Sequence, residues 1–303
     1  MIYRGRFAPS PSGPLHFGSL IAAVASFADA RAHHGDWRVR VEDLDQARAV
    51  PGAAAEILGT LRACGLRWDG ELLYQRERLS AYAEALAQLA GLGLTYPCGC
   101  SRSEIAENGR GGLAGVVYPG TCRNGLPPGR ARRSVRLRAR PGEVRFQDRI
   151  QGDQRQDVAQ AIGDFVLLRA DGVPAYQLAV VVDDAWQGIN HVVRGADLLA
   201  STPAQILLQQ ALGLPPPTYA HVPLAVDSAG RKLSKSLASA PIDPNNPLPA
   251  LRRAWAWLGQ EPAPDQVCVG TFWEHAARHW RIERVPAITS ACIDTGPSAS
   301  IGD

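Results

Sequence analysis

The chain has 303 residues, of which 46% are hydrophobic and 20% are charged, and its formal net charge at pH 7 is +3. These values are typical of a soluble globular protein with one to three domains, and the small net charge says little about nucleic acid. No apolar run is long enough to span a bilayer and no secretory leader is recognisable, so we expect a cytoplasmic protein with no membrane partner.

The first predicted element is an apolar strand over residues 1–8, followed by a turn rich in Pro, Ser and Gly and an Ala-rich helix over residues 20–31. This geometry points free backbone N–H groups and the positive end of a helix dipole at one spot, which suits a phosphate. His16 and Ser19 add side-chain donors there, and Gly18 allows a ligand to approach the backbone. From this stretch alone, an ordinary β–α turn with a capping serine is an equal alternative.

Strands and helices alternate over most of the chain, which indicates an α/β fold with a parallel sheet. The later predicted strands cover residues 37–45, 165–168, 176–184 and 190–197. The later predicted helices cover residues 51–66, 80–92, 202–212, 249–258 and 270–280.

Residues 96–160 break this pattern and are predicted to form an insertion between two halves of the sheet domain. Within them, residues 135–140 and 143–146 are predicted to pair as a β-hairpin. The glycine-rich stretch at residues 109–115 nearly spells a dinucleotide fingerprint but misses its spacing and follows no strand, so we expect a flexible loop.

Three of the six cysteines lie in one window of the insertion, together with a tyrosine: Cys98, Cys100, Tyr118 and Cys122. Thiolates select zinc among the common cellular metals. A Cys-x-Cys pair is less specific than Cys-x-x-Cys, so free buried thiols stay open as the alternative.

Seven arginines follow this window. Arginine at alternate strand positions puts one charged face on a hairpin, which could meet RNA phosphates. A solvated edge strand guarded by charge is an equal alternative. The seven are Arg130, Arg132, Arg133, Arg136, Arg138, Arg140 and Arg145.

A compact basic loop, Arg231-Lys232-Leu233-Ser234-Lys235-Ser236, lies late in the chain. Together, His16-Phe17-Gly18-Ser19 and Lys232-Leu233-Ser234-Lys235-Ser236 resemble the HIGH and KMSKS signatures of class I aminoacyl-tRNA synthetases. The run Arg6-Phe-Ala-Pro-Ser-Pro-Ser-Gly13 in front resembles the opening of glutamyl-tRNA synthetases. Ser19 replaces the last His of the first signature, a departure that glutamyl enzymes tolerate.

Amino-acid activation requires a carboxylate to attack the α-phosphorus of ATP while pyrophosphate leaves, so positioning and charge stabilisation dominate the catalysis. The resemblance implies that His16, Lys232 and Lys235 are catalytic and hold the phosphate oxygens of ATP, which enters as a substrate with Mg²⁺. The ATP-binding set that it implies is Pro9, His16, Gly18, Ser19, Lys232, Ser234 and Lys235.

A bound glutamate needs a cation for its side-chain carboxylate and a carboxylate for its ammonium group, and the fork of arginine suits a carboxylate. From the residues alone, Glu42 and Arg194 fit a structural ion pair better than a ligand site. The resemblance instead implies that they contact glutamate. The glutamate-binding set that it implies is Arg6, Phe7, Ala8, Pro9, Ser10, Glu42, Tyr176 and Arg194.

The insertion and the C-terminal region narrow the resemblance to one family within the class I synthetases. The Cys-x-Cys…Tyr-x-x-x-Cys spacing is similar to the zinc site of glutamyl-Q tRNA(Asp) synthetases, which implies structural Zn²⁺ on Cys98, Cys100, Tyr118 and Cys122. A full glutamyl-tRNA synthetase continues past its KMSKS loop with helical anticodon-binding domains, whereas only residues 243–284 are available here.

This resemblance implies a Rossmann-like class I catalytic domain with a zinc-containing insertion and a short helical C-terminal region. It implies that the chain activates L-glutamate as glutamyl-AMP without tRNA. Glutamate is then transferred to the queuosine base at the wobble position of tRNA(Asp). Three alternatives stay open: a compact glutamyl- or glutaminyl-tRNA synthetase that charges the 3′ end, a glutamate-adenylating enzyme with a non-tRNA acceptor, and a non-catalytic RNA-binding relic.

We expect a monomer. The expected division of the chain is residues 1–95 and 161–225 for the two halves of the catalytic domain, 96–160 for the zinc insertion, 226–288 for the lysine loop and helical C-terminal region, and 289–303 for a disordered tail.

Overall fold

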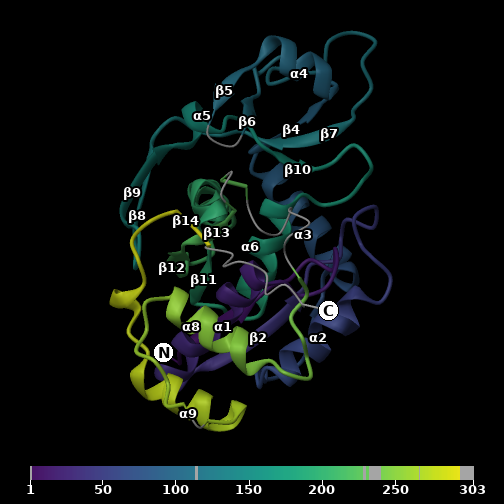
Figure 1. Cartoon of the computed structure of the whole chain (residues 1–303). Helices are drawn as coiled ribbons and strands as arrows, with labels where there is room; N and C mark the ends of the chain where they lie inside the picture. The colour runs from purple at the N-terminus through teal and green to yellow at the C-terminus, as the bar shows by residue number, and fades with distance from the viewer. Residues whose placement is uncertain (1, 113–114, 228–229, 232–239, 266, 294–303) are drawn as a thin grey trace, which may run out of the picture.

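A parallel sheet forms the centre of the computed structural model, which describes residues 2–112, 115–227, 230–231, 240–265 and 267–293 (Figure 1). Strands β1 (Arg4–Phe7), β2 (Asp36–Val41) and β3 (Leu73–Tyr74) pair in parallel, as do β11 (His191–Gly195) and β12 (Thr218–Val222). The backbone N–H of Asn190 donates to the carbonyl of Arg4 at 3.1 Å, which joins β1 to β11. The predicted α/β fold with a parallel sheet is therefore confirmed.

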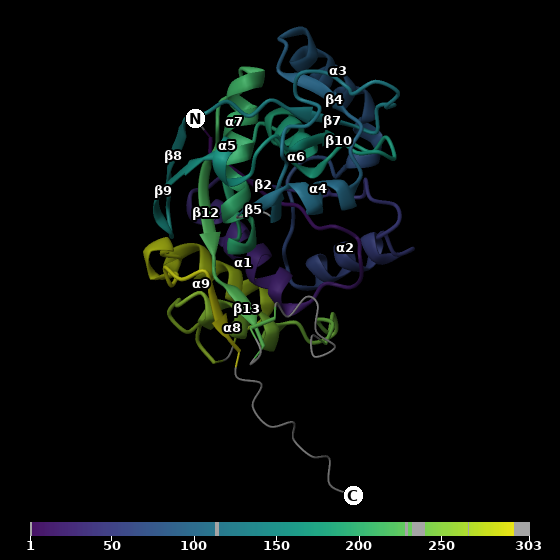
Figure 2. The ribbon, with the colours of Figure 1, turned by 90° about the horizontal axis from the view of Figure 1, so that it is seen from above.

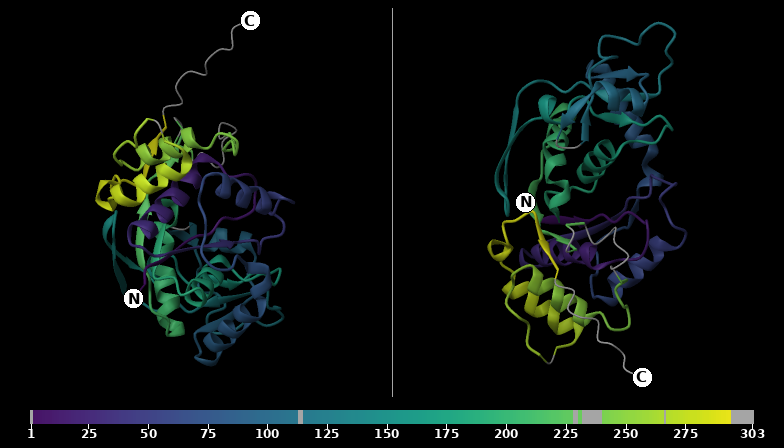
Figure 3. Two further views of the ribbon diagram at one scale, coloured as in Figure 1. Left: turned by 90° about the horizontal axis from the view of Figure 1, so that it is seen from below. Right: turned by 45° about the horizontal axis from the view of Figure 1, so that its top comes forward.

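Helix α1 (Phe17–Ala32) lies between this sheet and the C-terminal helices α8 (Leu248–Trp257) and α9 (Val269–His279) (Figure 3). Leu20, Ala23 and Val24 of α1 are fully buried. A helix that is apolar on all sides must be covered on all sides, and the C-terminal helices supply the second cover.

Helices α3 (Leu79–Gly91), α5 (Val158–Ala161), α6 (Tyr176–Trp186) and α7 (Thr202–Leu212) surround a second core on the other side of the sheet, and the insertion lies beyond them, at the end of the molecule away from α8 and α9 (Figures 1 and 2). Helix α2 (Ala53–Ala63) packs into the first core with α1, and α4 (Arg102–Asn108) lies in the insertion. The short 3₁₀ turns are η1 (Gln75–Arg78), η2 (Ala196–Ser201) and η4 (Ile282–Arg284). Among the described residues, no helix is both long and apolar enough to cross a membrane.

The strand predicted over residues 176–184 is wrong, because these residues form α6. The Val180-Val181-Val182 run favours a strand locally. In the fold, however, α6 packs against α3 and α7, and Leu178 and Val181 are buried there. Tertiary packing has overridden the local propensity.

The insertion is built on an antiparallel sheet of β4 (Thr95–Cys98), β7 (Ser134–Leu137) and β10 (Val166–Leu168), in the order β10-β7-β4. Strand β8 (Glu143–Asp148) instead pairs with β9 (Gly152–Asp157) and meets β12 at Tyr219. The predicted hairpin between residues 135–140 and 143–146 is therefore wrong. Both edges of β7 are already paired, so β8 has no free edge to join.

The flexible loop predicted at residues 109–115 is also wrong where the structure describes it. Strands β5 (Arg110–Gly112) and β6 (Gly115–Val117) pair antiparallel. A Cβ on Gly109 would lie 2.3 Å from Val116 Cγ1, so the glycine allows a close approach here.

The disordered tail predicted from residue 289 is wrong at its start. Strand β14 (Ser290–Cys292) pairs in parallel with β13 (Leu224–Val226), and Ile293 is buried beside it. The backbone N–H and C=O groups along the edge of β13 form hydrogen bonds with this segment, and burial of the Ile293 side chain holds it in place. Residues 294–303 lie outside the described part of the chain.

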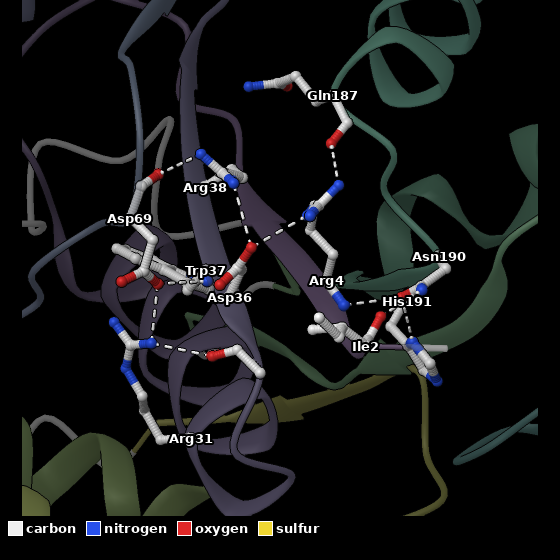
Figure 4. Close-up of polar contacts among 11 residues, drawn as sticks. Ile2, Arg4, Arg31, Asp36, Trp37, Arg38, Asp69, Gln187, Asn190 and His191 are labelled. Atoms are coloured by element: carbon white, nitrogen blue, oxygen red, sulfur yellow. Dashed lines mark hydrogen bonds and ion pairs between the residues drawn. The ribbon is translucent and has the colours of Figure 1, made fainter.

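Charged side chains join the amino ends of the parallel strands (Figure 4). Asp36 at the start of β2 accepts from Arg4 Nε at 3.2 Å and from Arg38 Nη2 at 3.1 Å. The Arg4 N–H donates to Asn190 Oδ1 at 2.7 Å. Protein contacts therefore occupy the amino ends of the parallel strands, which leaves their carboxyl ends for a ligand.

Candidate active site

The loop after β1 carries the first signature and ends in the cap of α1. His16 is the N-cap residue, and its Nδ1 accepts from the N–H of Ser19 at 3.3 Å. The Ser19 hydroxyl lies 3.1 Å from His16 Nε2. The predicted strand–loop–helix is therefore present, with His16 and Ser19 in contact at a partly exposed helix start that suits an anion.

The residues that follow the lysine loop lie against this first loop. Pro241 and His16 form an isolated antiparallel bridge, and the N–H of Ile242 donates to the carbonyl of Leu15 at 3.0 Å. The described residues that follow the second signature therefore contact the first signature, although more than 200 residues of the chain separate them. Lys232, Ser234 and Lys235 themselves lie outside the described residues.

A buried charge cluster lies at the carboxyl ends of β1 and β2. Arg6 on β1 is 3% exposed, and its Nε donates to Asp184 Oδ1 of α6 at 3.3 Å. The same Oδ1 accepts from Arg40 Nη1 of β2 at 2.7 Å, and Arg40 Nη2 donates to Glu42 Oε1 at 3.3 Å. Burial acts to raise the pKa of Asp184, but Arg40 and Arg6 outweigh it and the pKa is lowered.

Glu42 closes the cluster toward the first loop. Its N–H donates to the carbonyl of Pro9 at 2.9 Å, so the end of β2 is tied to the loop after β1. Burial raises the pKa of Glu42, although Arg40 and Arg6 act in the opposite direction. This buried carboxylate lies close to two guanidinium groups, and a bound ammonium group would further stabilise its ionised form.

Tyr176 and Arg194 complete the group. Tyr176 is the first residue of α6 and is 36% exposed, and Arg194 on β11 is 4% exposed. Desolvation raises the pKa of Tyr176, and the charges of Arg194, Glu42 and Arg6 all act on it. Arg6, Glu42, Tyr176 and Arg194 therefore lie close enough to interact electrostatically.

The charges of this cluster suit an acidic amino acid. Four guanidinium groups face three carboxylates, which leaves one positive charge in excess: Arg6, Arg40, Arg78 and Arg194 against Glu42, Asp183 and Asp184. An amino acid with an acidic side chain carries one net negative charge. Binding would therefore neutralise the site while giving its ammonium group a carboxylate partner.

The other residues predicted to contact glutamate differ in how exposed they are. The side chain of Phe7 is buried and stacks against Trp37 with 6.3 Å between ring centroids, so it belongs to the core. Ala8 is partly buried and Ser10 is exposed on the loop.

The three predicted thiols gather in the insertion. The sulfur atoms of Cys98, Cys100 and Cys122 lie within 4.8 Å of one another, and the last two are 3.7 Å apart. The Tyr118 hydroxyl lies 3.4 Å from Cys98 Sγ and 3.5 Å from Cys100 Sγ. Tetrahedral zinc with ordinary Zn–S and Zn–O bonds needs S···S distances of about 3.8 Å and S···O distances of about 3.5 Å. The donor set therefore fits zinc.

The electrostatics of this cluster are mixed, because burial raises the pKa of Cys100 and of Tyr118 whereas the pKa of Cys98 is lowered. Burial acts to raise the pKa of the Cys98 thiol, but hydrogen bonds from Tyr118 and Arg136 outweigh it and the pKa falls to about 7. The N–H of Cys122 donates to the Tyr118 oxygen at 2.8 Å, which supports negative charge there.

The arginines after the thiols do not share one face. Arg136 is buried, lies 3.9 Å from the centroid of the Tyr118 ring, and donates to the carbonyl of Asp164 at 2.8 Å. Arg138 lies over the Tyr96 ring at 4.8 Å. These two arginines hold the insertion together, so the predicted single charged face is wrong for them. Arg130, Arg132, Arg133, Arg140 and Arg145 are exposed.

A pocket of about 310 Å³ lies between the insertion and the start of α6, with Tyr118 and Tyr176 both in its lining. Its polar and aromatic lining includes Tyr118, Arg136, Asp164, Tyr176 and Gln177.

Sequence reasoning missed several residues of the charge cluster, Asp184 and Arg40 among them. Asp184, the last residue of the strand predicted over residues 176–184, was not among the predicted site residues, yet it accepts hydrogen bonds from both Arg6 and Arg40. Arg40 itself is fully buried. Its signal in the sequence is an arginine at the second-last position of a strand whose neighbours, Val39 and Val41, are apolar.

Comparison with known proteins shows which family has this sequence and fold. The family model described as "tRNA synthetases class I (E and Q), catalytic domain" matches residues 3–240. The chain is 54% identical over 286 residues to a glutamyl-Q tRNA(Asp) synthetase of Aromatoleum aromaticum, covering 94% of this chain and 90% of the relative. It is 55% identical to the protein of the same name from Dechloromonas aromatica, covering 94% and 96%.

Among solved structures, the glutamate–tRNA synthetase of Elizabethkingia anophelis matches with a TM-score of 0.80 and 25% identity. The match covers 97% of this chain and 68% of that one.

Proposed function

The chain belongs to the glutamyl-Q tRNA(Asp) synthetase family of class I synthetases, and on that premise we propose how its residues carry out the reaction. It is a ligase that activates L-glutamate with ATP and transfers it to queuosine in tRNA(Asp). The observation that carries the assignment of residues is the buried cluster at the carboxyl ends of β1, β2 and β11.

In this proposal, Arg6, Tyr176 and Arg194 bind the side-chain carboxylate of glutamate and Glu42 binds its ammonium group. Arg6 and Glu42 are held in place by Asp184 and Arg40, through contacts of 3.3 and 2.7 Å to Asp184 and 3.3 Å to Glu42. The site is therefore arranged before the substrate arrives, which lowers the cost of binding. The α-carboxylate is left directed at ATP.

ATP binds above the loop from Pro9 to Ser19. The start of α1 and His16 hold the α-phosphate, and the contact of His16 with Ser19 fixes the ring. Lys232 and Lys235 neutralise the β- and γ-phosphates, and the bridge between Pro241 and His16 supports this assignment, because it holds the chain just after these lysines against the first signature. Mg²⁺ accompanies ATP. As the glutamate carboxylate attacks, pyrophosphate carries away the negative charge that these groups stabilise.

Zinc in the insertion is held by Cys98, Cys100, Tyr118 and Cys122, and it would supply a structural cross-link between β4 and the segment after β6. It takes no part in the chemical step, because four protein donors fill its coordination. We expect the chain to act as a cytoplasmic monomer.

The first test is exchange of labelled pyrophosphate into ATP by the purified chain without any RNA. Exchange with glutamate, and with neither glutamine nor aspartate, is the expected result. Absence of exchange in a folded sample would remove tRNA-independent activation. Exchange with glutamine would remove the assigned role of the arginines.

A further inference from the structure

The guanidinium of Arg194 donates hydrogen bonds to two buried side chains, neither of which belongs to a sequence motif. Its Nε donates to His221 Nε2 of β12 at 3.0 Å, and its Nη2 donates to Thr202 Oγ1 at 2.8 Å. Its Nη1 is buried and has no hydrogen-bond partner among the described residues. A buried N–H pair left unpaired is costly, so this end of the guanidinium is built for a ligand.

His221 is in turn fixed by Asp148, the last residue of β8. The two side chains are fully buried, and His221 Nδ1 lies 2.6 Å from Asp148 Oδ2. The Asp148 carboxylate also accepts the N–H groups of Ile150, Gln151 and His221 at 3.0, 2.8 and 3.1 Å. Four donors therefore converge on Asp148, which keeps it ionised.

These contacts determine the tautomer of His221. Since Arg194 Nε carries a hydrogen, His221 Nε2 must be the acceptor, and the ring hydrogen must be on Nδ1, where it donates to Asp148. Burial is the main cause that lowers the pKa of His221 to about 4, so the ring is neutral at pH 7. A hydrogen on Nε2 would instead face the Arg194 N–H and push the guanidinium away.

We infer that Asp148 and His221 are positioning residues that orient Arg194 so that its Nη1 meets the side-chain carboxylate of the substrate. This inference rests on the proposed function, because it takes glutamate as the ligand of Arg194. It extends the specificity site beyond the residues in contact with the substrate, to the junction of β8, β11 and β12.

Asp148→Asn tests the tautomer directly. The Asn oxygen can keep the three backbone N–H bonds, while its amide donates to His221 Nδ1 and forces the ring hydrogen onto Nε2. We expect the KM for glutamate in pyrophosphate exchange to rise about tenfold or more, with the KM for ATP unchanged. Adding His221→Gln, whose amide oxygen can accept from Arg194 Nε, should restore most of the loss.

Gln151→Leu is the matched control, because Gln151 donates to the His221 carbonyl at 2.8 Å and does not touch Arg194. It should lower the melting temperature without changing the KM for glutamate. Ring ¹⁵N shifts of His221 should report hydrogen on Nδ1 in the wild type and on Nε2 in Asp148→Asn.

The outcomes separate the two claims. No exchange in the wild type overturns the proposed function and this inference with it. A wild type that exchanges normally beside an Asp148→Asn variant with unchanged KM for glutamate overturns the inference alone. The inference is also overturned if the KM for glutamate rises equally in Asp148→Asn and Gln151→Leu at equal losses of melting temperature.

Discussion

At the scale of single residues, the site depends on carboxylates that pair with arginines rather than with solvent. Arg40 is fully buried, and its charge is supported by Asp184 at 2.7 Å and Glu42 at 3.3 Å. Breaking such a buried pair leaves an uncompensated charge, which is more costly than the pair itself is favourable. Changes at these residues should therefore affect both stability and substrate binding.

Asp184→Asn should destabilise the protein at neutral pH and progressively less in acid. The pKa of Asp184 is lowered in the fold, so its contribution is present above the unfolded value of about 4 and disappears as pH falls through the folded value. Urea unfolding of wild type and variant from pH 7 to pH 3 measures the difference. A difference that grows below pH 4 would contradict the assigned ion pairs.

Glu42→Gln should raise the KM for glutamate about tenfold in pyrophosphate exchange, because the ammonium group loses its charged partner. The exposed Glu77→Gln serves as its control, since Glu77 lies on η1 with a side chain that is 60% exposed. An equal KM for glutamate in both variants would show that Glu42 has only a structural role.

At the scale of elements, the sequence predicts β1, β2 and β11, misses β3 and β12, and mistakes α6 for a strand. Strands β1 and β2 are neighbours in the chain and pair with each other, and β2 alternates apolar with charged residues, so local pattern and fold agree there. Helix α6 has the strand-forming run at Val180, and only its packing between α3 and α7 decides its state. The Asp148–His221 pair joins β8 to β12 and has no short spacing that a motif could show.

The stability of the insertion should depend on the proposed zinc. Cys98→Ser/Cys122→Ser should lose bound zinc and open the insertion to proteolysis, because its small core is formed largely by the ligands themselves. Cys292→Ser, at an exposed cysteine on β14, should keep both the zinc and the protease resistance. Elemental analysis with limited proteolysis checks this. Full zinc content in the double variant would contradict the ligand set.

At the scale of the whole molecule, one buried carboxylate joins the catalytic sheet to the C-terminal helices. Asp29 of α1 is fully buried and accepts from Arg149 Nη1 at 2.5 Å, from Trp280 Nε1 at 2.9 Å and from the Tyr3 hydroxyl. Three segments distant in sequence therefore meet on the helix whose N-cap residue is His16.

Asp29→Ala should lower the free energy of unfolding by about 3–5 kcal/mol, since Arg149 and Trp280 lose a common partner in the interior. Asp36→Ala removes a carboxylate that also pairs with two arginines but is 34% exposed, and it should cost about 1 kcal/mol or less. Urea unfolding compares the two. Equal losses would mean that the Asp29 contacts add nothing beyond a surface pair.

The most direct test of the whole account is transfer of labelled glutamate, with ATP, to tRNA(Asp) that carries queuosine and to an unmodified transcript. Labelling of the modified tRNA alone is predicted, persisting after removal of its 3′ nucleotide and lost after periodate has cleaved the diol of queuosine. Labelling of a tRNA(Glu) transcript that is lost on 3′ truncation would contradict the account and make the chain a compact conventional synthetase.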